Sequence, residues 1–302
     1  MSDLILELSG VAQAFGAKRI LHDINLRIPR GQFVSLVGPS GCGKSTLFRA
    51  VVGTHLTQKG EVRVFTAGGA SEGKRVTGPG RDRGIVYQKY SLFPFLTAQE
   101  NVAIGLTLDT TSLSFRLFRP WAWRRKRRDH LEQAAEMLKR VRLGDALNLY
   151  PHELSGGMQQ RVALAQAMVL QPDVILLDEP FGALDEATRE DLQSMLLELN
   201  RHNQAATARG EAPPLTLLIV THELNEALYV GDRVVGLSQH WDWAADGHSE
   251  FPGATIIYDR PAPISAIKSA RDFDQFKAQK EEIRRVVFEP KVKVRRGEFV
   301  NR

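Results

Sequence analysis

GPSGCGKS at residues 38–45 is the stretch of this chain that constrains the fold most strongly. It matches the pattern of a phosphate-binding loop, in which four residues separate the first glycine from a Gly-Lys-Ser ending. Glycines let successive backbone N–H groups curl around a phosphate without side-chain clashes. An apolar strand is expected before it at Phe33–Val37, and a helix after it at Ser45–Val52, with the positive helix end facing the anion. This context favours a phosphate site over a plain glycine turn.

The loop residues have distinct expected roles in binding ATP and Mg²⁺. Lys44 should reach the β- and γ-phosphates, and the Ser45 hydroxyl should be a Mg²⁺ ligand. Cys42 is expected to be a tolerated small residue, but a bulky adduct on its thiol should occupy the cradle and block ATP binding. The residues predicted to contact the nucleotide here are Gly38, Pro39, Ser40, Gly41, Cys42, Gly43, Lys44, Ser45 and Thr46.

Two acids follow a second apolar strand. Val174–Leu177 is a run of four apolar residues, and it ends in Asp178 and Glu179. Asp178 is placed to hold Mg²⁺, usually through water, and Glu179 to polarise the attacking water as general base. A strand ending in two acids is weak evidence alone, but it is strong evidence downstream of a phosphate loop.

A second glycine-containing motif, LSGGMQQ at residues 154–160, narrows the family. A phosphate loop alone is compatible with kinases, GTPases and helicases. Ser155 is a good helix N-cap, and the glycines after it leave the backbone bare, which creates another helix N-terminus able to bind a γ-phosphate. One phosphate cannot comfortably be cradled by both glycine loops of one chain.

This combination resembles the ABC ATPase family, in which two domains sandwich two ATP molecules head to tail. The resemblance implies an α/β fold: a P-loop NTPase core with an antiparallel β subdomain and an inserted α-helical subdomain. It also implies that each phosphate loop faces the signature helix of the opposite chain. The residues implied to bind nucleotide from that helix are Ser155, Gly156, Gly157 and Gln159.

Other landmarks of the family occur in order along the chain. Phe15, 29 residues before Lys44, matches the aromatic residue that stacks on adenine; the alternative is a core phenylalanine. Gln88 matches the glutamine that senses the γ-phosphate and Mg²⁺, and Ala183-Leu184-Asp185 matches the loop that contacts the opposite domain. His222 matches the histidine that contacts the γ-phosphate. The implied catalytic residues are Lys44, Glu179 and His222, and the implied metal-binding residues are Ser45, Gln88 and Asp178.

The hydrophobic pattern is strand-rich, then helical, then strand-rich again. It predicts an ATPase domain over residues 1–258, with the helical subdomain at about residues 90–170, and a partly helical extension over 259–302. A helix is expected at residues 272–287, packed on the chain's own core. Its candidate apolar anchors are Phe273, Phe276, Ile283 and Val287. Further strands are expected at residues 4–8, 24–28, 61–65, 84–87, 215–220 and 233–237.

Three stretches, residues 107–128, 204–214 and 239–253, are predicted to be surface insertions or loops. The first contains Trp121, Trp123 and seven of the forty Lys and Arg residues, all seven within 116–128. Three interpretations stay open for it: a solvated loop, contact with anionic lipid or a membrane subunit, and binding to nucleic acid. No recognisable nucleic-acid module accompanies it, so no nucleic-acid partner is expected.

Composition limits the class of protein without naming a function. The net charge is +5, the single cysteine excludes an internal disulfide framework, and no apolar run approaches the roughly 20 residues that cross a bilayer. The resemblance implies three partners: a second ATPase subunit, identical or paralogous, transmembrane permease subunits, and a periplasmic or surface substrate-binding protein acting through the permease. It places the chain at the cytoplasmic face of the membrane.

Short stretches refine the resemblance. Gly78–Gly84 and PFGALDEATRE at residues 180–190 are most similar to the ATPases of nitrate, sulfonate/taurine and bicarbonate importers. Alternatives are an ABC ATPase for lipid movement or export, a soluble ABC ATPase acting outside transport, and a non-catalytic regulatory cassette. Soluble members usually carry two cassettes or a long coiled coil, and regulatory ones usually lack the catalytic Glu or Lys. The sequence shows a single set of cassette motifs and no long coiled-coil pattern, and it retains both the Glu and the Lys.

Overall fold

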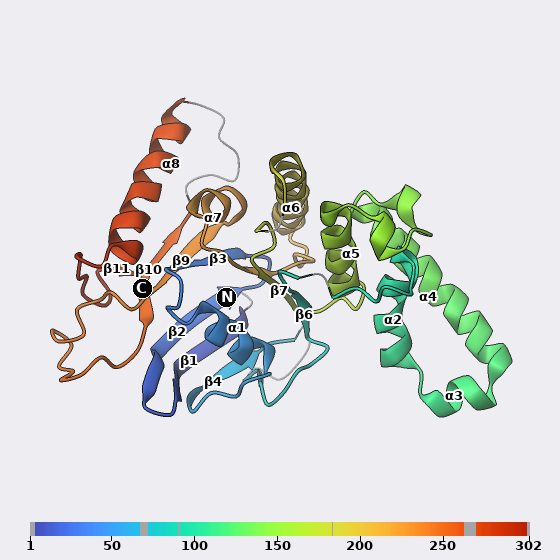
Figure 1. Ribbon diagram of the computed structural model, residues 1–302, viewed down its shortest axis with the longest axis horizontal. Coiled ribbons are helices and arrows are strands. Elements are labelled where there is room, and N and C mark those ends of the chain that lie inside the picture. The colour runs from blue at the N-terminus through green and yellow to red at the C-terminus, as the bar shows by residue number, and fades with distance from the viewer. Residues whose placement is uncertain (1–3, 67–71, 90, 183, 263–269, 301–302) are drawn as a thin grey trace.

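Two β-sheets and a projecting group of helices make up the computed structural model, which describes residues 4–66, 72–89, 91–182, 184–262 and 270–300 (Figure 1). The strands are β1 (Leu4–Phe15), β2 (Lys18–Pro29), β3 (Phe33–Val37), β4 (Lys59–Val64), β5 (Lys74–Arg75), β6 (Arg83–Val86), β7 (Val174–Asp178), β8 (Leu217–Val220), β9 (Arg233–Ser238), β10 (Thr255–Pro261) and β11 (Phe299–Val300). The α-helices are α1 (Lys44–Val52), α2 (Ala98–Thr110), α3 (Leu113–Phe118), α4 (Pro120–Arg140), α5 (Gly156–Met168), α6 (Glu186–Ala208), α7 (Leu224–Val230) and α8 (Ala270–Ile283). Short turns are η1 (Gly144–Ala146), η2 (Pro151–Glu153) and the π-helical η3 (Arg284–Phe288).

The larger sheet has the strand order β11-β10-β9-β3-β8-β7-β6. Its five strands from β9 to β6 are parallel, and β10 pairs antiparallel with β9. Every residue of β3 and β8 is buried, as expected for apolar strands covered on both faces. The predicted α/β class is therefore confirmed.

The smaller sheet, β2-β1-β4-β5, is antiparallel. It shares one apolar core with α1 and the larger sheet: Leu47 and Phe48 of α1 pack among buried residues such as Ile5 and Val34. The expected strands at residues 4–8 and 24–28 are each only part of a 12-residue strand. Register shifts along the β1–β2 pair interrupt the simple alternation of side chains, so the pattern in the sequence shows only the regular part.

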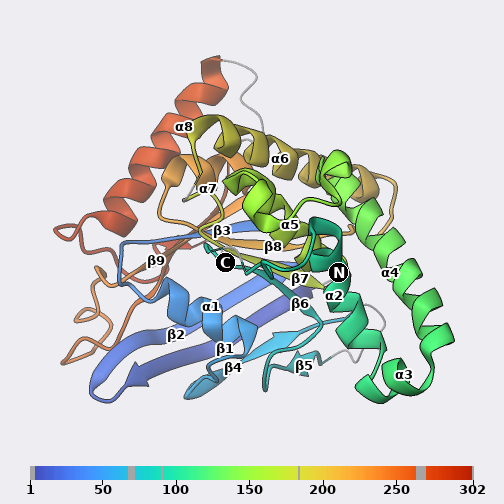
Figure 2. The same cartoon turned by 45° about the vertical axis from the view of Figure 1, so that its right-hand side comes forward.

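Helices α2, α3, α4 and α5 form the inserted helical group, with buried apolar side chains such as Leu106, Leu138 and Val162 in a common core. The prediction of a loop at residues 107–128 is wrong. The segment contains the end of α2, all of α3 and the start of α4, with α3 at the outer tip of the group in two views (Figures 1 and 2). Its Arg, Leu and Trp residues favour or tolerate helix, and Pro120 occupies the first turn of α4, where proline is accepted.

The other two predicted insertions differ from expectation in smaller ways. Residues 204–208 continue α6, so the loop there is shorter than predicted. In α6, the Asn203 side-chain amide donates to the Gly31 carbonyl oxygen at 3.0 Å, which holds this last part of the helix to the core. Residues 239–253 do form a loop, but Trp241 within it is fully buried and its indole N–H donates to the Gly253 carbonyl at 3.0 Å. This loop is therefore anchored in the core.

The C-terminal extension belongs to the same body as the core. The predicted division after residue 258 cuts through β10, a strand that the sequence pattern did not indicate. Ile283 and Val287 are fully buried and share a cluster with Leu228 of α7, which confirms the predicted packing. Phe273 is 55% exposed, so its prediction as an anchor is wrong: the first turns of α8 project beyond the body (Figure 1).

Among the described residues, none of the helices combines the length and apolar character needed to cross a membrane.

Candidate nucleotide site

Four neighbouring parallel strands end at one edge of the larger sheet and deliver most of the predicted site residues. β3 leads into the phosphate loop, β8 precedes His222, β7 ends in Asp178 and is followed by Glu179, and β6 precedes Gln88. The carboxyl ends of parallel strands are where open α/β sheets bind ligands. The fold thus brings together residues that are separated by up to 184 positions between Gly38 and His222.

The phosphate loop has a tightly constrained backbone. A Cβ on Gly38 would lie 2.2 Å from the Leu237 carbonyl oxygen, so only glycine fits at this position. Gly43 has φ 105° at the N-terminus of α1, a left-handed conformation that glycine adopts without strain. The Lys44 ammonium is buried and donates to the carbonyl oxygens of Gly38 at 2.6 Å and Pro39 at 3.1 Å. Its charge therefore lies inside the curl of the loop.

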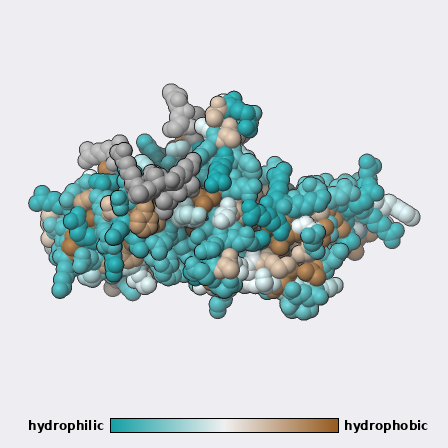
Figure 3. All heavy atoms as spheres, turned by 90° about the horizontal axis from the view of Figure 1, so that it is seen from above, coloured by the Kyte–Doolittle hydropathy of each residue, from teal (hydrophilic) through white to brown (hydrophobic). Residues whose placement is uncertain are grey.

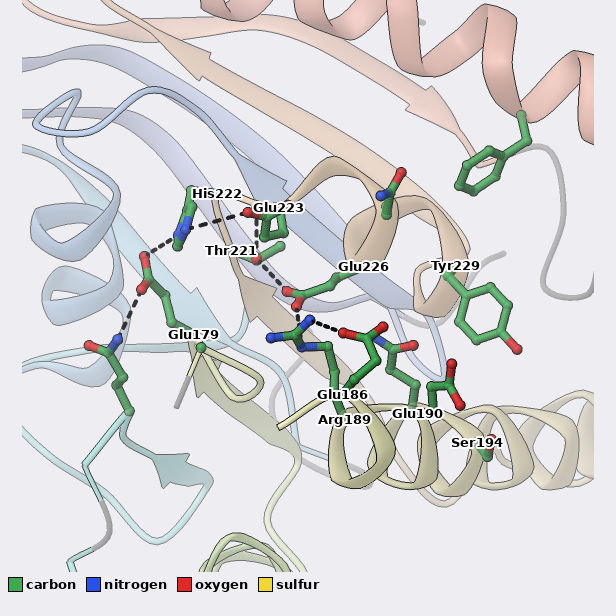
Figure 4. Close-up of a pocket in the computed structure, with 15 residues that line it drawn as sticks. Glu179, Glu186, Arg189, Glu190, Ser194, Thr221, His222, Glu223, Glu226 and Tyr229 are labelled. Carbon is green, nitrogen blue, oxygen red and sulfur yellow. Dashed lines mark hydrogen bonds and ion pairs between the residues drawn. The ribbon is translucent and has the colours of Figure 1, made fainter. Parts of the chain in front are cut away.

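Glu179 is held between two other predicted site residues (Figure 4). The Gln88 side-chain amide donates to Glu179 Oε2 at 3.2 Å, and His222 Nδ1 lies 3.0 Å from Glu179 Oε1. Glu179 itself has φ 47°, a conformation that costs a non-glycine residue energy and is concentrated at functional sites. The three side chains thus form one hydrogen-bonded group around a carboxylate.

Asp178 precedes Glu179 in the chain and is likewise half-buried. Burial and the negative charge of Glu179 raise its pKa, while the positive charges of Arg49 and Lys44 oppose that rise. Arg49, on α1, is a neighbour that the motifs did not reveal. A cation bound beside Asp178 and Glu179 would offset the repulsion between the two carboxylates.

A cavity of about 600 Å³ extends from Glu179 and His222 toward α6, α7 and Phe276 of α8. In the lining of this cavity, Thr221 donates its hydroxyl to Glu226 at 2.9 Å, and Glu226 lies 3.6 Å from the Arg189 guanidinium (Figure 4). Burial raises the pKa of Glu226. No motif in the sequence indicates this network, because its members are ordinary polar residues of α6, α7 and the segment between β8 and α7.

All of the remaining predicted residues except Phe15 form a second group, at the starts of α5 and α6. Ser155 caps α5 by accepting the Met158 N–H at 3.3 Å, and Asp185 caps α6 by accepting the Thr188 N–H at 3.0 Å. The Cα of Gly157 faces the Thr188 side chain directly. The start of α5, which carries the LSGGMQQ motif, is therefore in contact with the start of α6 next to Asp185. Ala183 lies outside the described residues.

Gln159 and Phe15, two residues predicted to contact the nucleotide, differ in their surroundings. The Gln159 side-chain amide donates to the carbonyl oxygens of Pro151 at 2.9 Å and Leu154 at 3.1 Å, an arrangement that holds the segment before α5 against this helix. Phe15 is 48% exposed at the end of β1 and meets the His55 ring edge-on at 6.1 Å. The alternative of a core phenylalanine at position 15 is therefore wrong.

Comparison with known proteins agrees with this site. The ABC transporter family model matches residues 21–182. The chain is 37% identical over 223 residues to the aliphatic sulfonates import ATP-binding protein SsuB of Bacillus cereus, covering 74% of this chain and 75% of the relative. It is 38% identical over 237 residues to the nitrate import ATP-binding protein NrtD of Synechocystis, covering 77% of each.

A solved structure has the same cassette architecture. The chain is similar, with a TM-score of 0.57 and 31% identity over 76% of this chain and 93% of the other, to a dimeric post-hydrolysis state of the ATP-binding cassette MJ0796 bound to ADP and phosphate. The match to a family model over more than half of the chain, together with these relatives, establishes the family. The chain is an ATP-binding ATPase of the ABC transporter family, of the importer type.

Proposed function

We propose that this ATPase energises uptake of a small anion or organic solute through a separate membrane permease, with Glu179 as the general base of ATP hydrolysis. The observation that carries the assignment of Glu179 is its carboxylate, held between the Gln88 amide and His222 Nδ1 at 3.2 and 3.0 Å. Because both oxygens are oriented by side chains from neighbouring strand ends, the carboxylate is fixed for proton abstraction from water.

The residues of the phosphate loop fit a bound nucleotide and its Mg²⁺. A Cβ on Gly41 would meet nothing within 4 Å, so the loop is open at this position, while Lys44 supplies a buried positive charge. Ser45 is exposed at the start of α1 and can offer its hydroxyl to the metal, with Asp178 and Gln88 as the other ligands proposed. Bound Mg²⁺ would neutralise charge on the β- and γ-phosphates.

The chain's own residues then have separable roles in hydrolysis. Lys44 stabilises the charge that develops on the γ-phosphoryl group, and the backbone N–H groups of residues 38–46 orient the phosphates. Glu179 accepts a proton from the attacking water, while His222 contacts the γ-phosphate and keeps the Glu179 carboxylate in position. Phe15, exposed at the end of β1, offers its ring to the adenine.

A second ATPase subunit completes the proposed site. The start of α5 carries Ser155, Gly156 and Gly157 within the helical group, apart from α1 in Figure 1. We assign these residues to the γ-phosphate of ATP held by the other chain, with Asp185 at the contact between the two chains. Gly157 contacts Thr188 near Asp185, so closure of the two chains would move the starts of α5 and α6 together.

The names of the relatives support an anion or organic solute as the transported substrate, since SsuB and NrtD are named for sulfonate and nitrate import. On this proposal the chain works at the cytoplasmic face of the membrane, bound to permease subunits. A substrate-binding protein would act from the other side through the permease. Transport specificity would reside in these partners, so the substrate class stays broad.

The partner assignment can be tested by recovering the Glu179→Gln chain from detergent-solubilised native membranes with ATP and Mg²⁺. We expect a multi-span permease to be recovered with it, and the ATPase activity of that complex to rise with the correct substrate. Recovery of ribosomal or DNA-bound proteins without a membrane subunit would leave the ATP chemistry standing and overturn the transport assignment. Recovery of an exporter would overturn only the direction of transport.

A further inference from the structure

The outer end of the helical group exposes an apolar surface that the ATP site does not use. Five large apolar side chains on α2, α3 and α4 are between 64% and 82% exposed: Leu108, Leu113, Leu117, Phe118 and Trp121. We call this set the apolar tip. Figure 3 views the molecule from above, the side away from α3 in Figure 1, and shows mixed hydrophilic and hydrophobic surface where the helical group lies, at its right-hand end. So many large apolar side chains exposed in one place indicate an interaction surface.

The helices hold the apolar tip in place from behind. His130 on α4 is buried, with its ring nitrogens 3.3 Å from Thr107 Oγ1 and 3.0 Å from Thr110 Oγ1 of α2. Arg116 donates to the Thr111 carbonyl oxygen at 3.0 Å and lies over the Trp123 ring at 5.7 Å. Polar contacts thus join α2, α3 and α4, so the exposed side chains belong to an ordered structure.

Positive charge surrounds the apolar tip. Residues 110–128 contain seven Arg and Lys residues and no Asp or Glu. Arg119, Arg124 and Arg125 form no ion pair with any carboxylate in the part of the chain that the structure describes, and Arg124 lies over the Trp121 ring at 5.7 Å. An open depression is lined by Arg124, Arg125 and Arg128. This surface can accept several anionic groups at once.

We propose that this end of the helical group, the apolar tip with its surrounding arginines, binds the surface of an anionic lipid membrane. Leu, Phe and Trp side chains at the tip would enter the interface between headgroups and acyl chains, while the arginine side chains extend to the lipid phosphates. The charge complements the negative surface potential of anionic leaflets, which acts on basic residues within a Debye length.

The composition of the surface favours lipid over the other partners. A nucleic acid would use the arginines, but the exposed aliphatic Leu108, Leu113 and Leu117 would have no base edge or phosphate to contact. A surface that only contacted the permease would not need this many positive side chains with no negative ones among them. Apolar and basic side chains at the same end of the molecule match the two components of an interfacial membrane anchor.

Vesicle sedimentation with the full chain tests this proposal without any transport partner. The probes are phosphatidylcholine vesicles and vesicles containing about 30 mol% phosphatidylglycerol, at about 0.05 and 0.5 M NaCl. We expect binding to the anionic vesicles at low salt, little binding to the neutral ones, and weakening at high salt. Trp121 should contribute a blue shift of fluorescence on binding, and Trp121→Ala should lose that shift.

Variants distinguish this surface from general positive charge. Arg124→Gln/Arg125→Gln should weaken binding to anionic vesicles by about tenfold or more, since each basic residue near the membrane surface contributes about fivefold in affinity. Lys291→Gln/Arg295→Gln removes the same charge from exposed positions in the C-terminal segment, and should change binding by less than about threefold. Both double variants should retain ATP hydrolysis, which serves as the check on folding.

Three results would overturn the proposal. These are equal binding to neutral and anionic vesicles, equal weakening by the two double variants, and no effect of Phe118→Ser/Trp121→Ser on vesicle binding. Tight, salt-sensitive binding to an RNA or DNA oligonucleotide with no vesicle binding would also overturn it. Because hydrolysis is measured separately, failure here leaves the ATPase and transport assignments unaffected.

Discussion

Replacing Gly157 by alanine should disturb the contact between the starts of α5 and α6. The added Cβ would lie 1.9 Å from Thr188 Cγ2, whereas ordinary van der Waals contact is 3.4–4 Å. Thr188 cannot turn away without loss, because its hydroxyl donates to Asp185 Oδ2 at 2.7 Å. The methyl group must therefore push the two helix starts apart or break the bond from the Thr188 hydroxyl to Asp185.

The size of the effect follows from these contacts. Forcing a methyl group into a filled space costs about 1–3 kcal/mol. The better helix preference of alanine offsets less than about 1 kcal/mol of this, since position 157 is in the first turn. We expect a net loss of about 1–2 kcal/mol in the free energy of unfolding. ATP hydrolysis should fall as well, because both displaced loops are assigned to the contact between subunits.

Urea unfolding of four chains tests this reasoning: wild type, Gly157→Ala, Thr188→Ser and the double variant. Thr188→Ser removes Cγ2 and keeps the hydroxyl, so it should relieve the clash and restore at least half of the loss in the double variant. A Gly157→Ala chain as stable as wild type would refute the argument. Equal stability of the single Gly157→Ala and double variants would also refute it, since Thr188 could not then be the obstacle.

Three further predictions concern the phosphate loop, the metal site and the C-terminal segment. Iodoacetamide should label Cys42 slowly at pH 7 and faster at higher pH, because the thiol is 2% exposed and burial raises its pKa. Labelling should abolish ATP binding, and full ATPase activity after stoichiometric labelling would disprove the steric argument. Asp178→Asn should raise the melting temperature of the nucleotide-free chain at pH 7. Burial and Glu179 raise the pKa of Asp178, so its charge opposes folding above that pKa, and the advantage of Asn should vanish as pH falls below the ordinary value of 3.8. A pH-independent difference would rule out this charge effect. Ile283→Ala should cost about 2–5 kcal/mol in urea unfolding, whereas Phe273→Ala should cost less than about 0.5 kcal/mol. Similar losses would mean that the segment does not pack as described.

Local patterns in the sequence were sufficient for the centre of the fold. The phosphate loop with its flanking strand and helix lies within residues 33–52, and the apolar strand ending in Asp178 within residues 174–178, so each is determined by a short stretch of sequence. Their positions are also fixed by backbone needs, as at Gly38, where any side chain would meet the Leu237 carbonyl. Such backbone requirements restrict the residue type at a position, so they can be recognised in the sequence.

Features that depend on distant contacts were not predictable in the same way. The helices at residues 113–128 have no apolar stripe facing a core, so an arginine-rich segment resembled a loop. β10 forms because it pairs with β9, and this pairing cannot be recognised from the sequence alone. The Thr221–Glu226–Arg189 network joins α6 to the segment before α7, and nothing local marks these residues as neighbours.

The turnover of Glu179→Gln, measured together with its ATP affinity, tests the proposed chemistry most directly. The glutamine keeps the shape of the side chain and can still bond to Gln88 and His222, but it cannot accept the proton of water. We expect ATP affinity to stay within a few-fold of wild type while hydrolysis falls by about 100- to 10,000-fold. Hydrolysis near the wild-type rate would mean that another residue is the base and that the Gln88–Glu179–His222 group has a structural role.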